Sequence, residues 1–326
     1  MTKSLPIIHS VIDSKALAKV ITSSWNLNFP IHCELLTRGM NDVYLIRESN
    51  GLKWACRVWR SNFRSEEEIS YETKYLEFLN AKELSVSEAH PTRDGLLYVS
   101  LNAIEGKRFC SLFRWVEGEA FGKKPDNERS YTLGQTIGKM HNLSLDFNAK
   151  PIRNVDSVNK MKHELCFLER MLFHREGEYN WYKKAINLIE NEINKLSSKI
   201  PFGPCHGDFH LYNAFFNKNE VTLLDFDNCG FDYFIADLNS FLWANDYVDV
   251  KDKSINENFL SGYKSIRLIN EIELSLMPLF YAAKEIRFLC GFAANVNAVG
   301  HSSLLNPNLD WFYDRTKKNI LSAGLI

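Results

Sequence analysis

The fold of this chain is decided by the stretch CHGDFHLYN (205–213) and by LLDFDNCGFDYFIADL (223–238), which closely follows it. Asp208 and Asn213 have the Asp-x-x-x-x-Asn spacing of kinase catalytic loops. Asp225 closes a run of apolar residues, so we expect it at the end of a strand. Phosphoryl transfer needs one carboxylate that orients the attacking hydroxyl and takes its proton, and an amide oxygen and a second carboxylate that hold a metal ion. The spacing alone is common by chance, but the His-Gly before it and the strand ending in Asp-x-Asp after it make the combination specific.

Other polar residues of the two stretches are expected to support the catalytic loop or the metal site. His206 is expected to brace the loop, whereas His210 fits a structural role and a functional one equally well. Asp227 could supplement the metal site, but in a strand its side chain would alternate away from that of Asp225. A polar turn whose side chains are satisfied locally remains the alternative, and it would need a separate explanation for each of these residues.

The N-terminal part of the chain predicts a small antiparallel sheet. Strand-like segments surround the hairpin signal Asn50-Gly51, and a helix that Ser65 can cap separates them from two further strands. The expected strands are 33–37, 43–48, 53–59, 96–102 and 108–115, and the expected helices are 14–24 and 65–80.

From Glu117 onward the pattern becomes mostly helical. The expected helices are 128–142, 158–173, 179–197, 234–245, 255–264 and 276–296, interrupted by a hairpin with strands near 214–216 and 221–225. We therefore expect an α+β chain of two lobes: a nucleotide-binding lobe over residues 1–115, and a helical lobe over residues 116–326 that carries the catalytic loop, the metal site and the acceptor site.

Composition excludes several classes of protein. The chain has 326 residues and a net charge of −1, which favours neither general nucleic-acid binding nor attraction to an anionic membrane. No apolar run approaches the roughly 18 residues of a membrane helix, and the N-terminus does not resemble a signal peptide. The seven cysteines are dispersed without a CxxC pair, so buried thiols are expected rather than a zinc site. These features predict a cytoplasmic protein.

The two quoted stretches resemble the catalytic and metal motifs of the aminoglycoside phosphotransferase and choline kinase-like family, which has a protein-kinase-like fold. The resemblance implies that Asp208 is the catalytic base, that Asn213 and Asp225 bind Mg²⁺, and that Asp237 braces the catalytic loop from the start of a helix. It also implies ATP or GTP as co-substrate. The acceptor would be a hydroxyl of a small molecule such as an amino alcohol, an amino acid, a sugar or an aminoglycoside.

The segments expected to bind the nucleotide are less distinctive in sequence than the two catalytic stretches. The segment 36–44, with Gly39 and Asn41, resembles the phosphate loop of the same family, although an ordinary hairpin turn would look alike. Arg57 stands where protein kinases have the lysine that contacts the α- and β-phosphates. Glu72 on the following helix is its expected ion-pair partner, and a solvated glutamate is the alternative.

Segment 111–118 resembles the hinge at which adenine pairs with the main chain, so we expect the Arg114 carbonyl and the Val116 amide at the base edge. Farther along, segment 133–142 contains Gly134, Gly138 and His141, which are better explained by close helix packing than by catalysis.

The acceptor site is expected near the C-terminal helices. Lys284 and Arg287 share a face of the helix 276–296. The favoured interpretation is a solvated or salt-bridged face, with Glu285 and other carboxylates as partners. The alternative is that one of the two cations meets an anionic group of the acceptor. The C-terminal part of the chain has no dense acidic run, which disfavours a polycationic acceptor.

Two other functions remain open. A protein Ser/Thr kinase of the bacterial stress-response type would share the motifs, but the short segment between Asp225 and Asp237 leaves no evident activation segment and favours a compact acceptor. A nucleotide-binding pseudokinase would be consistent with Arg57 and the single-glycine loop. The intact Asp208 and Asn213 argue against that alternative.

Overall fold

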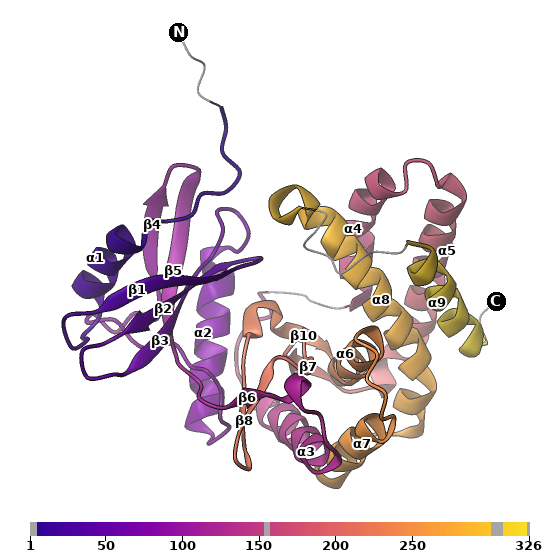
Figure 1. The fold of residues 1–326 in the computed structure, drawn as a ribbon. Helices are drawn as coiled ribbons and strands as arrows, with labels where there is room; N and C mark the ends of the chain where they lie inside the picture. The colour runs from indigo at the N-terminus through magenta and orange to yellow at the C-terminus, as the bar shows by residue number, and fades with distance from the viewer. Residues whose placement is uncertain (1–4, 153–156, 301–308, 325–326) are drawn as a thin grey trace. The chain divides into compact units, whose positions relative to one another are not determined.

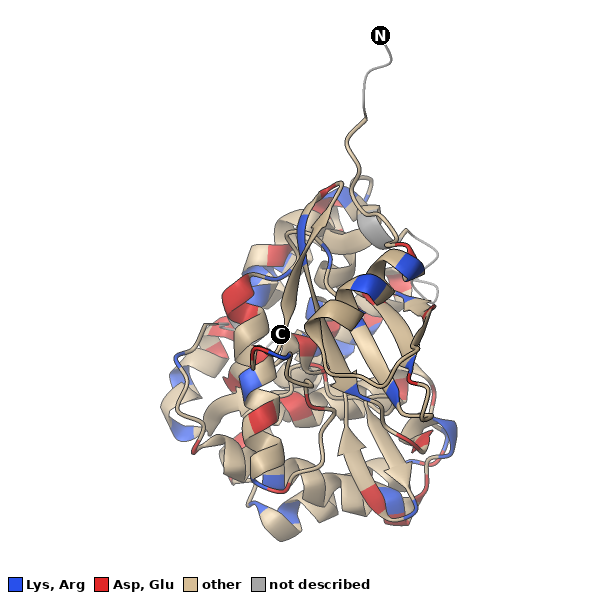
Figure 2. Cartoon of the chain, turned by 90° about the vertical axis from the view of Figure 1, so that its left-hand side faces the viewer, with Lys and Arg blue, Asp and Glu red and all other residues tan. Residues whose placement is uncertain are grey.

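The computed structural model describes residues 5–152, 157–300 and 309–324. The chain divides into two compact units, residues 1–117 and residues 118–326 (Figure 1). Within the described residues, no helix is both long enough and apolar enough to cross a bilayer. Acidic and basic residues are interspersed over the face shown in Figure 2, in keeping with a net charge of −1.

The first unit contains a five-stranded antiparallel sheet in the order β1-β2-β3-β5-β4. The strands are β1 (His32–Arg38), β2 (Asp42–Arg47), β3 (Lys53–Val58), β4 (Val99–Ala103) and β5 (Gly106–Arg114). The predicted turn between β2 and β3 is present: Asn50 Oδ1 accepts the Leu52 amide N–H at 3.0 Å, and Gly51 has a φ of 89°. The expected antiparallel sheet is therefore confirmed.

Two helices cover this sheet. Helix α1 (Ser14–Ser24) packs its buried Leu17 and Ile21 against the even-numbered side chains of β2, β3 and β5, such as Tyr44 and Cys56. Helix α2 (Glu66–Ala81) begins with the predicted capping box, in which Ser65 Oγ accepts from the Glu68 amide and Glu68 accepts from the Ser65 amide. Because side chains alternate across a strand, the two helices take opposite faces of the sheet.

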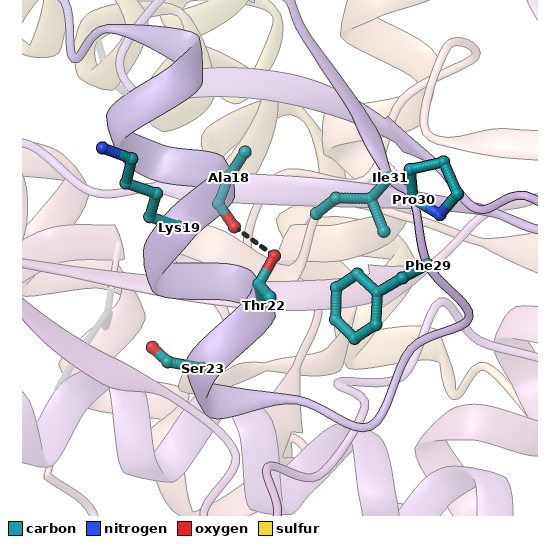
Figure 3. Close-up of a pocket in the computed structure, with 7 residues that line it drawn as sticks. All are labelled: Ala18, Lys19, Thr22, Ser23, Phe29, Pro30 and Ile31. Atoms are coloured by element: carbon teal, nitrogen blue, oxygen red, sulfur yellow. Dashed lines mark hydrogen bonds between the residues drawn. The ribbon is translucent and has the colours of Figure 1, made fainter.

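A shallow pocket lies beside α1 (Figure 3). Its lining is mostly apolar and comes from α1 and the loop before β1: Ala18, Lys19, Thr22, Ser23, Phe29, Pro30 and Ile31. The pocket lies on the α1 side of the sheet, so it is separate from the candidate nucleotide residues on the α2 side.

The second unit is mostly helical. Its helices are α3 (Asn127–Ser144), α4 (Ser157–Met171), α5 (Glu176–Leu196), α6 (Phe234–Tyr247), α7 (Ser254–Ile266), α8 (Glu271–Val299) and α9 (Leu309–Ser322). Helices α3 and α7 approach closely at glycines. A Cβ on Gly134 would lie 2.0 Å from the Phe259 carbonyl oxygen, and one on Gly262 would lie 1.9 Å from that of Tyr131. The packing role predicted for Gly134 is confirmed.

Short strands position the loops of this unit. Strand β8 (Ala214–Asn217) pairs with β9 (Glu220–Leu223) and with β6 (Glu119–Ala120), while β7 (Phe202–Cys205) pairs with β10 (Gly230–Tyr233). The sequence predicted only the β8–β9 hairpin. It also missed α9, although the buried residues Phe312, Thr316 and Ile320 recur at helical spacing.

Candidate active site

The candidate catalytic loop connects β7 to β8 and depends on a glycine. Gly207 has a φ of 81°, and a Cβ there would lie 2.0 Å from the Asn228 carbonyl oxygen. Only glycine combines this conformation with this approach. The loop that carries Asp208 is thereby held against the short 3₁₀ turn Phe226–Asn228.

Asp237, in the first turn of α6, fixes the catalytic loop through hydrogen bonds to its backbone. Its carboxylate accepts the amide N–H groups of His206 at 2.7 Å and Gly207 at 2.9 Å, and its Oδ2 lies 3.2 Å from His141 Nε2. Burial alone would raise the pKa of Asp237, but the hydrogen bond and charge of His141 outweigh it and lower that pKa. The ionised carboxylate therefore fixes two consecutive amides of the loop.

Hydrogen bonds bring the three candidate residues together. Asn213 Nδ2 donates to the Asp208 carbonyl oxygen at 3.0 Å, and the Leu224 amide donates to the Asn213 carbonyl oxygen at 2.9 Å. Asp225 follows directly, in the left-handed conformation with φ 59° and ψ 61°. The expectation that Asp225 ends a strand was wrong in detail, because β9 stops at Leu223, where its pairing with β8 ends.

Asp208 has a cationic partner from a distant helix. Its Oδ1 lies 2.7 Å from Nζ of Lys284 in α8, whose side chain is 13% exposed, whereas that of Asp208 is 36% exposed. Burial would raise the pKa of Asp208, but the charges of Lys284 and His210 lower it well below its usual range. Asp208 is thus an ionised and partly accessible carboxylate at neutral pH.

The second cation on this face of α8 is also paired. Arg287 Nη1 lies 3.5 Å from Asp232 Oδ2 in β10, while Glu285 pairs with Arg315 Nε at 2.9 Å. The favoured interpretation of an ion-paired face agrees with these contacts, but Glu285 was the wrong partner. It points away from Lys284 along the helix because successive residues face different directions.

The two histidines of the loop differ. The ring of His206 packs on that of Phe226 at 4.3 Å between centroids, and its Nε2–H donates to the Leu224 carbonyl oxygen at 2.8 Å, as a bracing residue would. His210 Nδ1 accepts the Tyr212 amide at 3.2 Å, and burial lowers the pKa of His210. Asp227 is buried in a 3₁₀ turn, so the argument from strand alternation was wrong for it.

One further cluster has metal-ligating side chains. His141, Cys205 and Asp237 have ligand atoms within 4.8 Å of one another. However, His141 and Asp237 already bond to Tyr263 and to the catalytic loop, and burial raises the pKa of the Cys205 thiol. The hydrogen bonds of His141 and Asp237 within the protein therefore account for both side chains without a ligand.

The candidate nucleotide residues of the first unit form their own group. Arg57 Nη1 lies 2.5 Å from Glu72 Oε1, and the guanidinium also covers the ring of Phe113 at 4.7 Å. The predicted ion pair is present. In the β1–β2 loop the Gly39 amide donates to the Asn41 carbonyl oxygen at 3.0 Å.

The expected hinge residues end β5 and follow it. The Arg114 carbonyl oxygen accepts from Ser87 Oγ at 2.8 Å, which leaves one lone pair for another donor. Val116 lies just beyond the strand and is half-buried.

Residues 33–273 match the model of the phosphotransferase enzyme family APH. The chain belongs to this family. Among its relatives, a homoserine kinase of Agrobacterium fabrum is 29% identical over 227 residues, 65% of each chain. An amicoumacin kinase of Bacillus subtilis is 26% identical over 255 residues, 74% of this chain and 73% of the relative.

Solved structures of APH enzymes share the fold. That of the amicoumacin kinase hAmiN, in complex with AMP-PNP, Ca²⁺ and Ami, aligns with a TM-score of 0.74 at 16% identity and covers 95% of this chain and 94% of that one. The chain is therefore an α+β protein of kinase-like fold and a member of a phosphotransferase family, and the relatives named above are kinases of small molecules.

Sequence reasoning missed two residues near these sites. It weighed Lys284 as an acceptor contact but not as the partner of Asp208, from which it is 76 positions away. It did not consider Arg60, which donates to the Gly39 carbonyl oxygen of the β1–β2 loop. The basic character of the segment 57–64 was the only sequence signal for Arg60.

Proposed function

We propose that this APH-family protein transfers the γ-phosphoryl group of ATP or GTP to a hydroxyl of a small molecule, with Mg²⁺ as the metal. The observation that carries the proposal is the hydrogen-bonded link from Asp208 to Asn213 and from Asn213 to the residue before Asp225. Three oxygen-bearing side chains are thereby gathered on two adjoining loops of the second unit.

The donor atoms fit a hard divalent cation. Because Asn213 Nδ2 is engaged by the Asp208 carbonyl, the amide oxygen is the end left for a metal, and Asp225 adds a carboxylate. Asp227 is a lesser candidate for the same task. Bound Mg²⁺ would neutralise charge on the nucleotide phosphates. The Ca²⁺ and AMP-PNP bound by hAmiN support a metal–nucleotide pair here.

Asp208 would orient the acceptor hydroxyl and take its proton. Lys284 keeps this carboxylate ionised and restricts its rotamers, so that one oxygen is fixed and the other remains for the acceptor. A strongly acidic carboxylate is a weak base, and positioning of the hydroxyl is therefore its main contribution. The loop amides that Asp237 holds keep Asp208 in place.

The first unit would bind the nucleotide. Arg57, oriented by Glu72, would contact the α- and β-phosphates, and the loop with Gly39 and Asn41 would cover them. The Arg114 carbonyl and the Val116 amide would meet the base edge. We accordingly assign nucleotide binding to residues 1–115 and phosphoryl transfer to residues 116–326.

The acceptor would be a compact alcohol such as an amino alcohol, an amino acid, a sugar or an aminoglycoside-like compound. The homoserine and amicoumacin kinases among the relatives support a small molecule. ADP release should be measured with Mg·ATP against a panel of these alcohols, together with the position of label from [γ-³²P]ATP. The proposal predicts that one alcohol stimulates ADP release and carries the label. Label on protein alone, or nucleotide binding without transfer to any member of the panel, would contradict it.

A further inference from the structure

Burial alternates along the catalytic loop. Phe209 and Leu211 are almost fully buried, with at most 1% of either residue exposed, whereas Asp208 and His210 are half-buried. The two apolar side chains anchor the loop in the core of the second unit, so the polar side chains between and before them face away from that core. His210 therefore lies on the same side of the loop as the Asp208 carboxylate.

Two hydrogen bonds fix His210 in this position. Its Nδ1 accepts the Tyr212 amide N–H at 3.2 Å, and its carbonyl oxygen accepts the Asn213 amide N–H at 2.9 Å. A ring nitrogen that accepts a hydrogen bond cannot carry a proton, so the proton of the ring is on Nε2. The loop thus presents one N–H donor of fixed tautomer two residues after Asp208.

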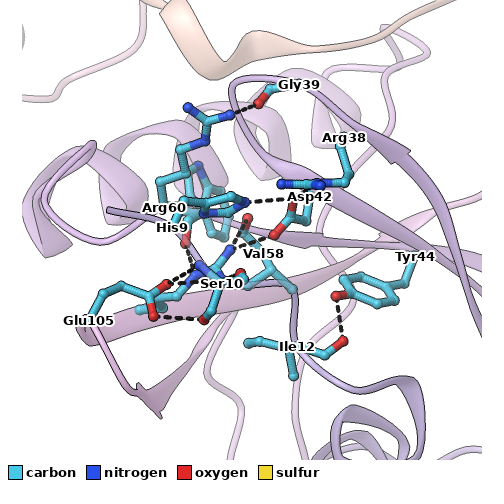
Figure 4. A network of polar contacts seen from close by, with 12 residues as sticks. His9, Ser10, Ile12, Arg38, Gly39, Asp42, Tyr44, Val58, Arg60 and Glu105 are labelled. Atoms are coloured by element: carbon cyan, nitrogen blue, oxygen red, sulfur yellow. Dashed lines mark hydrogen bonds and ion pairs between the residues drawn. The ribbon is translucent and has the colours of Figure 1, made fainter. Parts of the chain in front are cut away.

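This donor is open, whereas the corresponding atoms of other histidines are used within the protein. His9 Nε2 lies 3.0 Å from Asp42 Oδ1 in the polar network of the first unit (Figure 4), and His206 Nε2 donates to a backbone carbonyl oxygen. In the part of the chain that the structure describes, His210 Nε2 bonds to no other group, and it is not among the buried polar atoms that lack a partner. It is therefore accessible to a ligand.

The charges of the candidate catalytic and metal-binding residues act on this ring. Burial lowers the pKa of His210 most strongly, and the charge of Lys284 adds to this effect. The charges of Asp208 and Asp225 act in the opposite direction. In the proposed reaction Asp208 would hold the acceptor hydroxyl and Asp225 the metal on the phosphates, so the phosphoryl group would pass between them. The ring of His210 is close enough to both carboxylates to face that path.

We infer that His210 is a further catalytic residue, whose Nε2–H donates a hydrogen bond to an oxygen of the phosphoryl group in transit. This inference rests on the proposed phosphotransferase function. In that step the acceptor oxygen bonds to phosphorus, and the hydroxyl proton goes to Asp208. The bond from phosphorus to the bridging oxygen breaks, and its electron pair leaves with the nucleoside diphosphate. His210 keeps its proton throughout and stabilises negative charge on the transferred oxygens.

Two substitutions separate this task from a structural one. His210→Asn keeps an acceptor for the Tyr212 amide, because asparagine side chains bond the backbone N–H two residues on, but it has no donor at the position of Nε2. His210→Gln loses that acceptor and brings its NH₂ group near the position of Nε2. His174→Asn is the matched control, since it makes the same change at an exposed histidine between α4 and α5.

Steady-state kinetics with Mg·ATP and an alcohol that stimulates ADP release compare the wild type with the three variants. We expect His210→Asn to lower kcat by about 10²- to 10³-fold while KM for Mg·ATP and for the alcohol stays within about threefold. Its melting temperature should stay near that of the wild type. His210→Gln should recover part of kcat, and His174→Asn should have the kcat of the wild type.

Binding of a mimic of the transferred group gives a readout that does not depend on turnover. Aluminium fluoride with Mg·ADP stands in for the phosphoryl group in transit, and its binding is measured by isothermal titration calorimetry. We expect His210→Asn to weaken binding of Mg·ADP with aluminium fluoride by about 10- to 100-fold and to leave the affinity for Mg·ADP alone unchanged.

A structural role for His210 predicts the opposite order of the variants. His210→Asn would then match the wild type, and His210→Gln would lose both activity and thermal stability. That order overturns the inference, as does equal binding of Mg·ADP with aluminium fluoride by His210→Asn and the wild type, or a loss confined to KM for the alcohol. In each of these cases the wild type still transfers phosphate, so the proposed function stands. A wild type that transfers phosphate to no alcohol contradicts the proposed function and the inference with it.

Discussion

The replacement Asp237→Asn tests how the catalytic loop is held. The carboxylate accepts two consecutive loop amides, at 2.7 Å from His206 and at 2.9 Å from Gly207, and it is buried. Asparagine keeps one acceptor oxygen but places an NH₂ group against the other amide. A buried N–H without an acceptor costs about 1–3 kcal/mol, and the clash between donors adds to this, so we expect a loss of about 2–4 kcal/mol. In a unit of this size that lowers the melting temperature by about 5–15 °C.

Thermal unfolding followed by circular dichroism and by calorimetry measures this loss on the full chain. Asp314→Asn makes the same change at an exposed position of α9 and should stay within about 0.5 kcal/mol of the wild type. Because the same amides flank Asp208, turnover should fall together with stability. The reasoning is refuted if Asp237→Asn melts with the wild type while Asp314→Asn behaves as expected.

Three more perturbations have distinct readouts. Gly134→Ala places a Cβ 2.0 Å from a carbonyl oxygen of α7 and should lower the free energy of unfolding, measured by chemical denaturation, by at least about 1–3 kcal/mol. Gly177→Ala, in open space on α5, should instead raise it by up to about 1 kcal/mol. Burial raises the pKa of Glu285 from 4.5 to about 7, although the charge of Arg315 opposes the shift. The folded protein therefore binds the Glu285 proton more tightly than the unfolded chain does. The resulting stabilisation is complete below pH 4.5 and is lost as the pH rises through 7. The free energy of unfolding of Glu285→Gln, measured by denaturant titration, should rise relative to that of the wild type by up to about 3 kcal/mol between pH 4.5 and 8. A difference between the two proteins that does not change with pH would contradict this. Asp225→Ala should lose about three orders of magnitude in turnover while the protein stays folded at the assay temperature, although alanine fits a φ of 59° less well than aspartate, and near-normal turnover would remove Asp225 from the site.

Local features of the site were predictable from sequence. The spacing of Asp208 and Asn213 and the glycine at 207 together specify a tight loop, and such short-range geometry is encoded in neighbouring residues. The Arg57–Glu72 pair was also anticipated, because the end of a strand and the middle of the next helix adopt a recurrent arrangement. The ion pair itself is present, while its task in nucleotide binding stays a prediction.

Long-range contacts and strand ends were not predictable in the same way. Lys284 reaches Asp208 only because α8 packs against α6 and the loop between β7 and β8, and a helical pattern says nothing about which loop its charged face will meet. The apolar run before Asp225 indicated a strand through that residue, but a strand ends where its partner ends, and β8 pairs no farther than Leu223. The hydrogen bond from Arg60 to the Gly39 carbonyl oxygen likewise depends on where the β1–β2 loop folds relative to the end of β3.

The most direct test of the account uses ³¹P nuclear magnetic resonance to follow Mg·ATP and an alcohol that stimulates ADP release, in the presence of wild type or Asp208→Asn. Asparagine has nearly the same shape, but it has no charge to pair with Lys284, offers only one acceptor oxygen for positioning the hydroxyl and cannot take the hydroxyl proton. The account predicts that the wild type converts the γ-phosphate signal into that of a new phosphomonoester of the alcohol, and that Asp208→Asn forms it at least about 10²–10⁴ times more slowly while still binding nucleotide. Equal rates of phosphomonoester formation by the two proteins would contradict the account.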